Sequence, residues 1–153
     1  MIQRKQTVFL LVAVILTVVC LCLPIGGFNG VGGAPAGGAD MYNLWINMPD
    51  GSHDFSVWAL FAILLVTCPI ALIAVFSYHN RITQSRYCMF NMLLVVGWYV
   101  VYAMSAASLS GDLGDFSFSF TAILPAIAFI LYFMARKAIL ADEALVRAAD
   151  RIR

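Results

Sequence analysis

Residues 8–23 read VFLLVAVILTVVCLCL, an uncharged apolar run that directly follows Arg4 and Lys5. At about 1.5 Å of rise per residue, a helix of this length can just cross a hydrocarbon core of about 30 Å. Basic residues that precede a first crossing favour the cytoplasmic side, so this run predicts the orientation of the rest of the chain. We interpret it as a retained helix over about residues 7–24 rather than as a cleavable signal peptide.

The composition argues against a water-soluble domain. Of the 153 residues, 63% are hydrophobic and 11% are charged, whereas a soluble domain carries about 25% charged residues. Four cysteines lie in or beside the apolar runs without a CxxC spacing, so they predict packing residues rather than a redox motif or a zinc site.

Three further apolar runs predict crossings over about residues 55–78, 87–109 and 118–137. Pro69 lies inside the second run and predicts a kink, and Pro125 in the fourth run frees the carbonyl of Thr121. The predicted fold class is an all-α membrane protein in which a single domain, residues 1–153, contains four transmembrane helices.

The loop over residues 25–54 divides into two parts. Residues 26–38 are rich in glycine and predict a flexible linker. Residues 42–48 alternate between apolar and polar types and lead into the turn signal Pro49-Asp50-Gly51-Ser52, which predicts a short hairpin on the membrane surface, although the same residues also fit a helical stripe. The alternating segment 116–120 predicts an aromatic belt or an extended piece that pairs with this hairpin.

Charge segregation predicts the membrane topology. All nine Lys and Arg residues fall in the N-terminus, the second loop or the tail, whereas the first and third loops contain aspartates and no basic residue. Under the positive-inside rule, both termini and the second loop are cytoplasmic and the hairpin forms a non-cytoplasmic cap. We therefore expect a multi-pass protein of a bacterial inner membrane.

The tail, residues 138–153, predicts an amphipathic cytoplasmic helix. Leu145 and Ile152 share one face, and Glu143 and Arg147 are spaced for an i,i+4 ion pair. Such a helix either lies among lipid headgroups or docks on a partner protein. We expect the tail to fold back beneath the bundle, with Asp142 or Glu143 near Arg81 or Arg86 of the second loop; the alternative is a straight helix that projects from the bundle.

Polar residues in the interiors of the predicted crossings are few, and none of them is Lys, Arg, Asp, Glu or His, because Arg136 and Lys137 lie at the end of the fourth crossing. They form stripes on the third and fourth helices, and interhelical hydrogen bonds explain these stripes well. The alternative is a small cavity that holds a lipid or another apolar ligand. The residues that would line it are Asn91, Trp98, Tyr102, Ser105, Thr121 and Tyr132.

Three segments of the sequence resemble a family of bacterial four-helix inner-membrane proteins known as a domain of unknown function. The likeness covers the whole chain except the glycine-rich loop, and the tail is its most specific part. This resemblance implies four crossings and no assigned activity. The residues that carry it are Met1-Ile2-Gln3-Arg4, Gln6-Thr7-Val8, Pro24, Asn80-Arg81, Gln84, Arg86, Cys88, Pro125, Asp142-Glu143-Ala144-Leu145-Val146-Arg147 and Asp150-Arg151-Ile152-Arg153.

The sequence favours a non-enzymatic function, because no nucleophile has a base beside it and no Lys, Arg, Asp, Glu or His lies in the interior of a crossing. We expect a scaffold or accessory subunit of a larger envelope complex, with no catalytic residue, cofactor or metal. Its partners would be membrane lipids and other membrane or cytoplasmic proteins, not nucleic acid. The alternative is a lipid binder that uses the face of Trp98 and Tyr102. The predicted partner or lipid contacts are Arg81, Arg86, Glu143, Leu145, Arg147 and Ile152.

Overall fold

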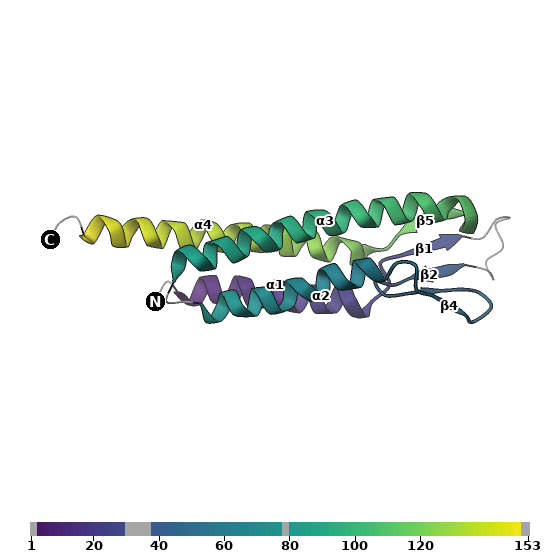
Figure 1. Ribbon diagram of the computed structural model, residues 1–153, viewed down its shortest axis with the longest axis horizontal. Helices are drawn as coiled ribbons and strands as arrows, with labels where there is room; N and C mark the ends of the chain where they lie inside the picture. Colours follow the sequence, from purple (N-terminus) through teal and green to yellow (C-terminus); the bar gives the residue numbers. More distant parts are fainter. Residues whose placement is uncertain (1–2, 30–37, 78–79, 151–153) are drawn as a thin grey trace.

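The computed structural model describes residues 3–29, 38–77 and 80–150. Four α-helices in these residues run side by side along the long axis of the molecule, and five short strands lie at one end (Figure 1). The helices are α1 (Gln3–Cys22), α2 (Trp58–Phe76), α3 (Arg81–Leu113) and α4 (Leu124–Asp150). The predicted helical architecture is therefore confirmed, and a small sheet is added to it.

Three helical segments are long and apolar enough to cross a membrane: Trp58–Phe76, Arg81–Gly111 and Phe120–Ala149. Their mean hydropathies are 2.8, 1.8 and 1.8. The described apolar part of α1, Gln6–Cys22, is shorter. Large apolar side chains such as Val8, Phe76 and Met104 are exposed around the helices, which is the surface that a lipid environment accepts.

The helix boundaries differ from the predicted crossings, most clearly at the starts of α3 and α4. Helix α3 begins at Arg81, so Arg81 and Arg86 lie in its first turns rather than in a loop. An apolar run marks only the part of a helix within hydrocarbon, and Arg and Gln are good helix formers that continue it into polar surroundings. Helix α4 begins at Leu124 after the 3₁₀ turn η1 (Phe120–Ile123), so Pro125 lies in a first turn, where its missing N–H is tolerated. The carbonyl of Thr121 is not left free, because the N–H of Leu124 donates to it.

The strands form one antiparallel sheet in the order β4-β3-β2-β1-β5. The predicted hairpin is present, because β3 (Ile46–Asn47) pairs with β4 (His53–Asp54) across a turn at Gly51, whose φ is +82°. In this turn the hydroxyl and the N–H of Ser52 donate to Asp50, and these bonds lower the pKa of the Asp50 carboxyl.

The start of the glycine-rich loop is a strand, which corrects the prediction of a flexible linker. Strand β1 (Gly26–Asn29) lies between β2 (Ala39–Met41) and β5 (Asp115–Phe118). The segment 116–118 therefore pairs with β1 rather than with the hairpin. At Gly26 a Cβ atom would lie 2.5 Å from Cζ of Phe116, so the close approach of β1 and β5 explains this glycine. Residues 30–37 lie outside the described part of the chain.

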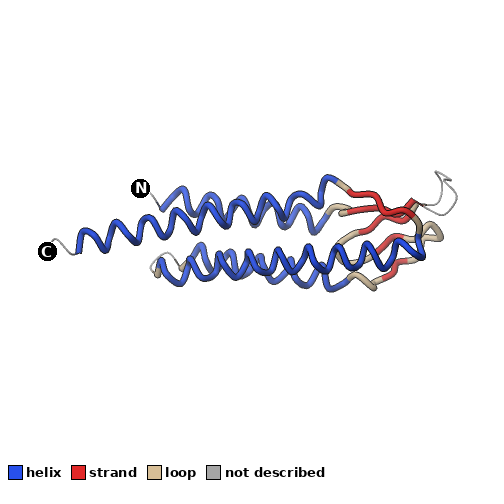
Figure 2. Tube along the Cα trace, turned by 90° about the horizontal axis from the view of Figure 1, so that it is seen from above, coloured by secondary structure: helices blue, strands red, loops and turns tan. Residues whose placement is uncertain are grey.

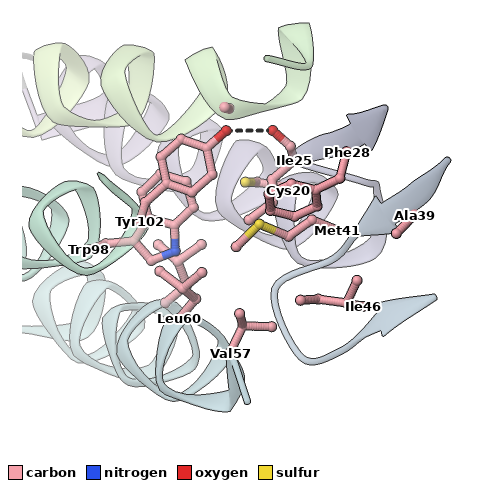
Figure 3. Close-up of a cluster of buried hydrophobic side chains, with 12 residues drawn as sticks. Cys20, Ile25, Phe28, Ala39, Met41, Ile46, Val57, Leu60, Trp98 and Tyr102 are labelled. Carbon is pink, nitrogen blue, oxygen red and sulfur yellow. Dashed lines mark hydrogen bonds between the residues drawn. The ribbon is translucent and has the colours of Figure 1, made fainter. Parts of the chain in front are cut away.

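Two clusters of buried side chains fill the bundle. The cluster beneath the sheet joins Cys20 of α1, Leu60 of α2 and Trp98 of α3 to Phe28 and Met41 of the strands (Figure 3). The second cluster fills the half of the bundle away from the sheet, where Tyr132 and Ile139 of α4 are fully buried. The interior is therefore packed along most of its length.

The start of α1 and the end of α4 lie at the same end of the bundle, opposite the sheet (Figure 2). We call these the terminal end and the sheet end. Helix α4 continues without a break to Asp150 and extends past the other helices (Figure 1). The prediction that the tail folds back beneath the bundle is wrong, because no Gly or Pro interrupts residues 126–150 and the helix simply continues.

Candidate functional site

The terminal end contains a buried polar junction between three helices. The side-chain amide of Gln6 on α1 donates to Oδ2 of Asp142 on α4 over 2.8 Å, and Nη1 of Arg81 on α3 donates to the backbone carbonyl of Asp142 over 3.2 Å. Gln6 and Asp142 are only 3% and 7% exposed. Asp142 is thus the residue on which α1, α3 and α4 converge. The predicted proximity of Asp142 to Arg81 is confirmed, although the contact is made by the backbone carbonyl of Asp142.

Beyond this junction the residues of α4 from 144 to 149 are exposed. Leu145 is 64% exposed and does not pack against helix ends, as the folded-back tail required. Nε of Arg147 donates to Oε1 of Glu143 over 3.1 Å, so the predicted i,i+4 pair is present. Arg86 is exposed on the surface of α3, and Ile152 lies outside the described residues.

A cavity of about 530 Å³ lies where α4 leaves the bundle. Asn80, Arg81, Ile82 and Thr83 at the start of α3 form one side of it, and Glu143 and Val146 of α4 form the other. Its lining mixes apolar and charged side chains from both helices. This arrangement suits contact with a polypeptide or a lipid headgroup, and neither is present in the structure.

A layer of polar residues crosses the middle of the bundle, and it includes two of the predicted cavity residues. Nδ2 of Asn91 on α3 donates to the backbone carbonyl of Thr67 on α2 over 3.3 Å. The hydroxyl of Tyr132 on α4 interacts with the side chains of Thr17 and Asn91, although it makes no hydrogen bond of ordinary geometry among the described residues. All four residues are buried, so this layer joins helices and does not line an open cavity.

The predicted pair Trp98 and Tyr102 anchors the sheet to the helices. Their rings stack with centroids 5.0 Å apart and planes 9° apart. The hydroxyl of Tyr102 donates to the carbonyl of Ile25 over 2.7 Å (Figure 3). The indole N–H of Trp98 donates to Oδ1 of Asn43 over 3.1 Å. Trp98 is fully buried, so it is a core residue rather than part of a cavity wall.

Asn43 is a central residue that the sequence did not single out. Its side-chain amide also donates to the backbone carbonyl of Cys20 over 2.7 Å. The backbone carbonyl of Asn43 accepts from the backbone N–H of Phe61. Cys20 lies in the last turn of α1, where backbone carbonyls have no partner within the helix. One buried asparagine therefore joins α1, α2, α3 and the sheet. The only signal in the sequence was an amide residue within an apolar alternation.

The other two predicted cavity residues lie apart from each other. Ser105 and other residues of α3 line a separate cavity of about 330 Å³, and Ser56 and Val57, which precede α2, also line it. Thr121 of η1 accepts a hydrogen bond from the hydroxyl of Ser119 over 3.4 Å. No group of three His, Cys, Asp or Glu side chains that could hold a metal ion occurs among the described residues.

The comparison with protein families decides where the chain belongs. Residues 2–152 match the family described as a domain of unknown function, DUF4293. The chain is a member of the DUF4293 family. This membership confirms the resemblance that the sequence suggested, and it covers nearly the whole chain. No curated protein matches this DUF4293 chain.

The structure brings together residues from all three segments that carried the resemblance. Gln6 belongs to the first segment, Arg81 and Gln84 belong to the second, and Asp142 belongs to the tail. Gln6, Arg81 and Asp142 are joined by hydrogen bonds, and Gln84 is buried one turn along α3 from Arg81. In this DUF4293 chain the most distinctive polar residues thus mark the terminal end, and we take the junction and the projecting helix as the candidate site.

Proposed function

We propose that this protein is a non-enzymatic scaffold or accessory subunit of a cell-envelope complex in a bacterial inner membrane, and that it binds a partner protein through the projecting part of α4. The observation that carries the proposal is that α4 extends to Asp150 beyond the bundle while Leu145 and Val146 remain 64% and 43% exposed. An amphipathic helix that presents apolar residues in this way is a common recognition element.

The physical argument concerns the stability of that helix. A few helical turns without tertiary contacts are marginal in water, because most helical stability in proteins comes from packing of an apolar face. The base of the projecting part is held by Asp142, and the pair of Glu143 and Arg147 adds about 0.3–0.5 kcal/mol. A partner that covers Leu145 and enters the 530 Å³ cavity beside Arg81 would supply the missing contacts.

Charge supports a cytoplasmic location for this end. Arg81, Arg86, Arg136, Lys137 and Arg147 all lie on α3 and α4 toward the terminal end, whereas Asp40, Asp50, Asp54 and Asp115 belong to the sheet and its turns. The positive-inside rule then orients the terminal end toward the cytoplasm. Membrane-impermeant thiol labelling of intact cells tests this orientation. We expect a cysteine at Gly111 to be labelled and one at Ala148 to be protected, and the reverse pattern would contradict it.

In vivo photo-crosslinking tests the partner contact. A photoreactive amino acid at Leu145 is compared with one at Arg147, which is similarly exposed but lies about 200° around the helix. We expect a discrete protein adduct from position 145 and a much weaker one from position 147. Adducts to lipid alone would mean that the helix lies among headgroups, and equal protein adducts from both positions would mean that the contact is not specific to the face of Leu145. Either result would contradict the proposal.

A further inference from the structure

A groove of about 800 Å³ lies at the sheet end, on the outside of the bundle between α3 and the start of α4. Its volume is within the range of about 300–1,000 Å³ that single small ligands occupy. Small side chains of α3, η1 and α4 line it, together with two phenylalanines of β5 and η1. These residues are Ala103, Ala106, Ala122, Ala126, Phe118 and Phe120.

The phenylalanines are exposed to an unusual degree. Phe118 of β5 is 77% exposed and Phe120 of η1 is 89% exposed, although both rings border the groove. Ala106 and Ala122, in contrast, are only 8% and 7% exposed. The groove therefore combines a closely packed base with aromatic rings that no described part of the chain covers. Aromatic residues in this position are typical of the boundary between hydrocarbon and headgroups.

The polar groups in the groove are already used within the protein. The hydroxyl of Tyr99 donates to the carbonyl of Ala122 over 2.7 Å, and that of Tyr102 donates to the carbonyl of Ile25 over 2.7 Å. Ser119 donates to Thr121. None of the described residues that line the groove is charged. An occupant would gain apolar contact and no ion pair, so the lining suits a hydrocarbon chain and not a headgroup.

Both walls of the groove continue into the lipid-facing surface. Ile123 borders the groove and is 51% exposed, and Ile127 and Ile130 follow it on the same face of α4 with exposures of 41% and 56%. On α3, Val100 and Val96 precede Ala103 on one face and are 54% and 49% exposed. In a membrane, lipid chains cover these two stripes, and the groove lies between the stripes at the sheet end.

We propose that this groove holds one acyl chain of a membrane phospholipid from the leaflet on the sheet side. The groove takes the place of the lipid-binding surface that the sequence predicted at Trp98 and Tyr102. Trp98 is buried in the core, and only Tyr102 of these two residues lines the groove. The inference is independent of the proposed role of α4. A second copy of this chain or an apolar peptide would be a different occupant, and the test distinguishes them.

The experiment uses the full chain in vesicles of phosphatidylcholine that contain a phosphatidylcholine with a diazirine on its acyl chain. After illumination, mass spectrometry maps the labelled residues. We expect labelling concentrated on the groove residues of α3, η1 and β5, and no such concentration when the diazirine is on the headgroup. Uniform labelling along α3 and α4, or crosslinks between two protein chains at the groove, would overturn the proposal.

A pair of variants sharpens the test. Ala103→Trp fills the groove from an exposed position, whereas Leu93→Trp adds the same side chain to the lipid-facing surface of α3 away from the groove. We expect groove labelling to fall to the level of the surrounding surface in Ala103→Trp and to remain unchanged in Leu93→Trp. Undiminished groove labelling in a folded Ala103→Trp protein would overturn the proposal, and if that variant does not fold, the wild-type labelling map decides.

Discussion

The two ends of this molecule use buried polar residues in different ways. At the sheet end, Asn43 makes hydrogen bonds to three separate elements and has no exposed surface. At the terminal end, Asp142 is joined to Gln6 and Arg81, and α4 then leaves the bundle directly beyond it. At the sheet end, the buried polar contacts thus join the elements that they contact into one packed unit. At the terminal end, they hold the base of the projecting part of α4, which itself remains exposed.

Because of this difference, we expect the sheet end to contribute mainly to the stability of the protein and the terminal end mainly to partner binding. Loss of a partner within a closed network leaves buried groups without hydrogen bonds, which is costly. Loss of a contact beside an exposed helix allows water to replace it. Substitutions at the sheet end should therefore affect the free energy of unfolding most, and those at the terminal end should affect it least. Three substitutions test this order, each measured by denaturant unfolding in detergent.

Asn43→Leu should have the largest effect. It leaves the carbonyl of Cys20 and the indole N–H of Trp98 buried without partners, each at a cost of about 1–3 kcal/mol, so we expect a loss of about 2–5 kcal/mol. Asn47→Ala on the adjacent strand is the control, because its Oδ1 has no hydrogen-bond partner among the described residues. A loss that is equal in the two variants would show that Asn43 is not the centre of the network.

Gly26→Ala should have the next largest effect. Its Cβ would lie 2.5 Å from Cζ of Phe116 and 3.2 Å from the carbonyl of Ser117. The Phe116 ring is held by Phe28 and Tyr102, with centroids 5.0 and 5.8 Å away, so we expect an overpacking cost of about 1–3 kcal/mol. Gly27→Ala is the matched control, since its nearest contact is 3.4 Å. An unchanged stability for Gly26→Ala would mean that β1 and β5 separate easily.

Gln6→Ala should have the smallest effect of the three. It removes the amide that donates to Asp142, which is 7% exposed and lies at the end of the bundle where α4 leaves it, so we expect a loss of about 1 kcal/mol. Glu143→Ala, which breaks only the exposed pair with Arg147, should change stability by less than about 0.5 kcal/mol. A loss for Gln6→Ala as large as that of Asn43→Leu would reject the distinction between the two ends.

The sequence predicted the elements whose cause is local. The apolar run over residues 8–23 coincides with most of α1, although α1 already begins at Gln3, and the turn at Gly51 correctly predicted the pairing of β3 with β4. Pairing of β1 with β5 was missed because it joins segments on either side of two helices, and no local pattern specifies such a partner. The uninterrupted course of α4 did have a signal, since residues 126–150 contain neither Gly nor Pro.

The candidate sites were less predictable because their residues depend on partners that lie far away in the sequence. Helical spacing correctly placed Trp98 and Tyr102 on one face of α3, but a shared face does not reveal whether it meets protein or an open groove. Trp98 meets Asn43, and only Tyr102 reaches the groove. Asn43 and Gln6 gain their roles entirely from partners elsewhere in the chain. Residue type and spacing carry no information about such partners.

The hydrogen bond between Gln6 and Asp142 also bears on biosynthesis, because its two residues are 136 positions apart. At about 5–20 residues per second, translation from one to the other takes roughly 7–27 s. Helix α1 is synthesised before α4, so Gln6 precedes its polar partner by that interval. During the interval Gln6 has no Asp142 to bind, and the packing of α1 at this junction waits for α4. Synthesis of α4 is therefore the step that allows the buried junction between the two helices to form.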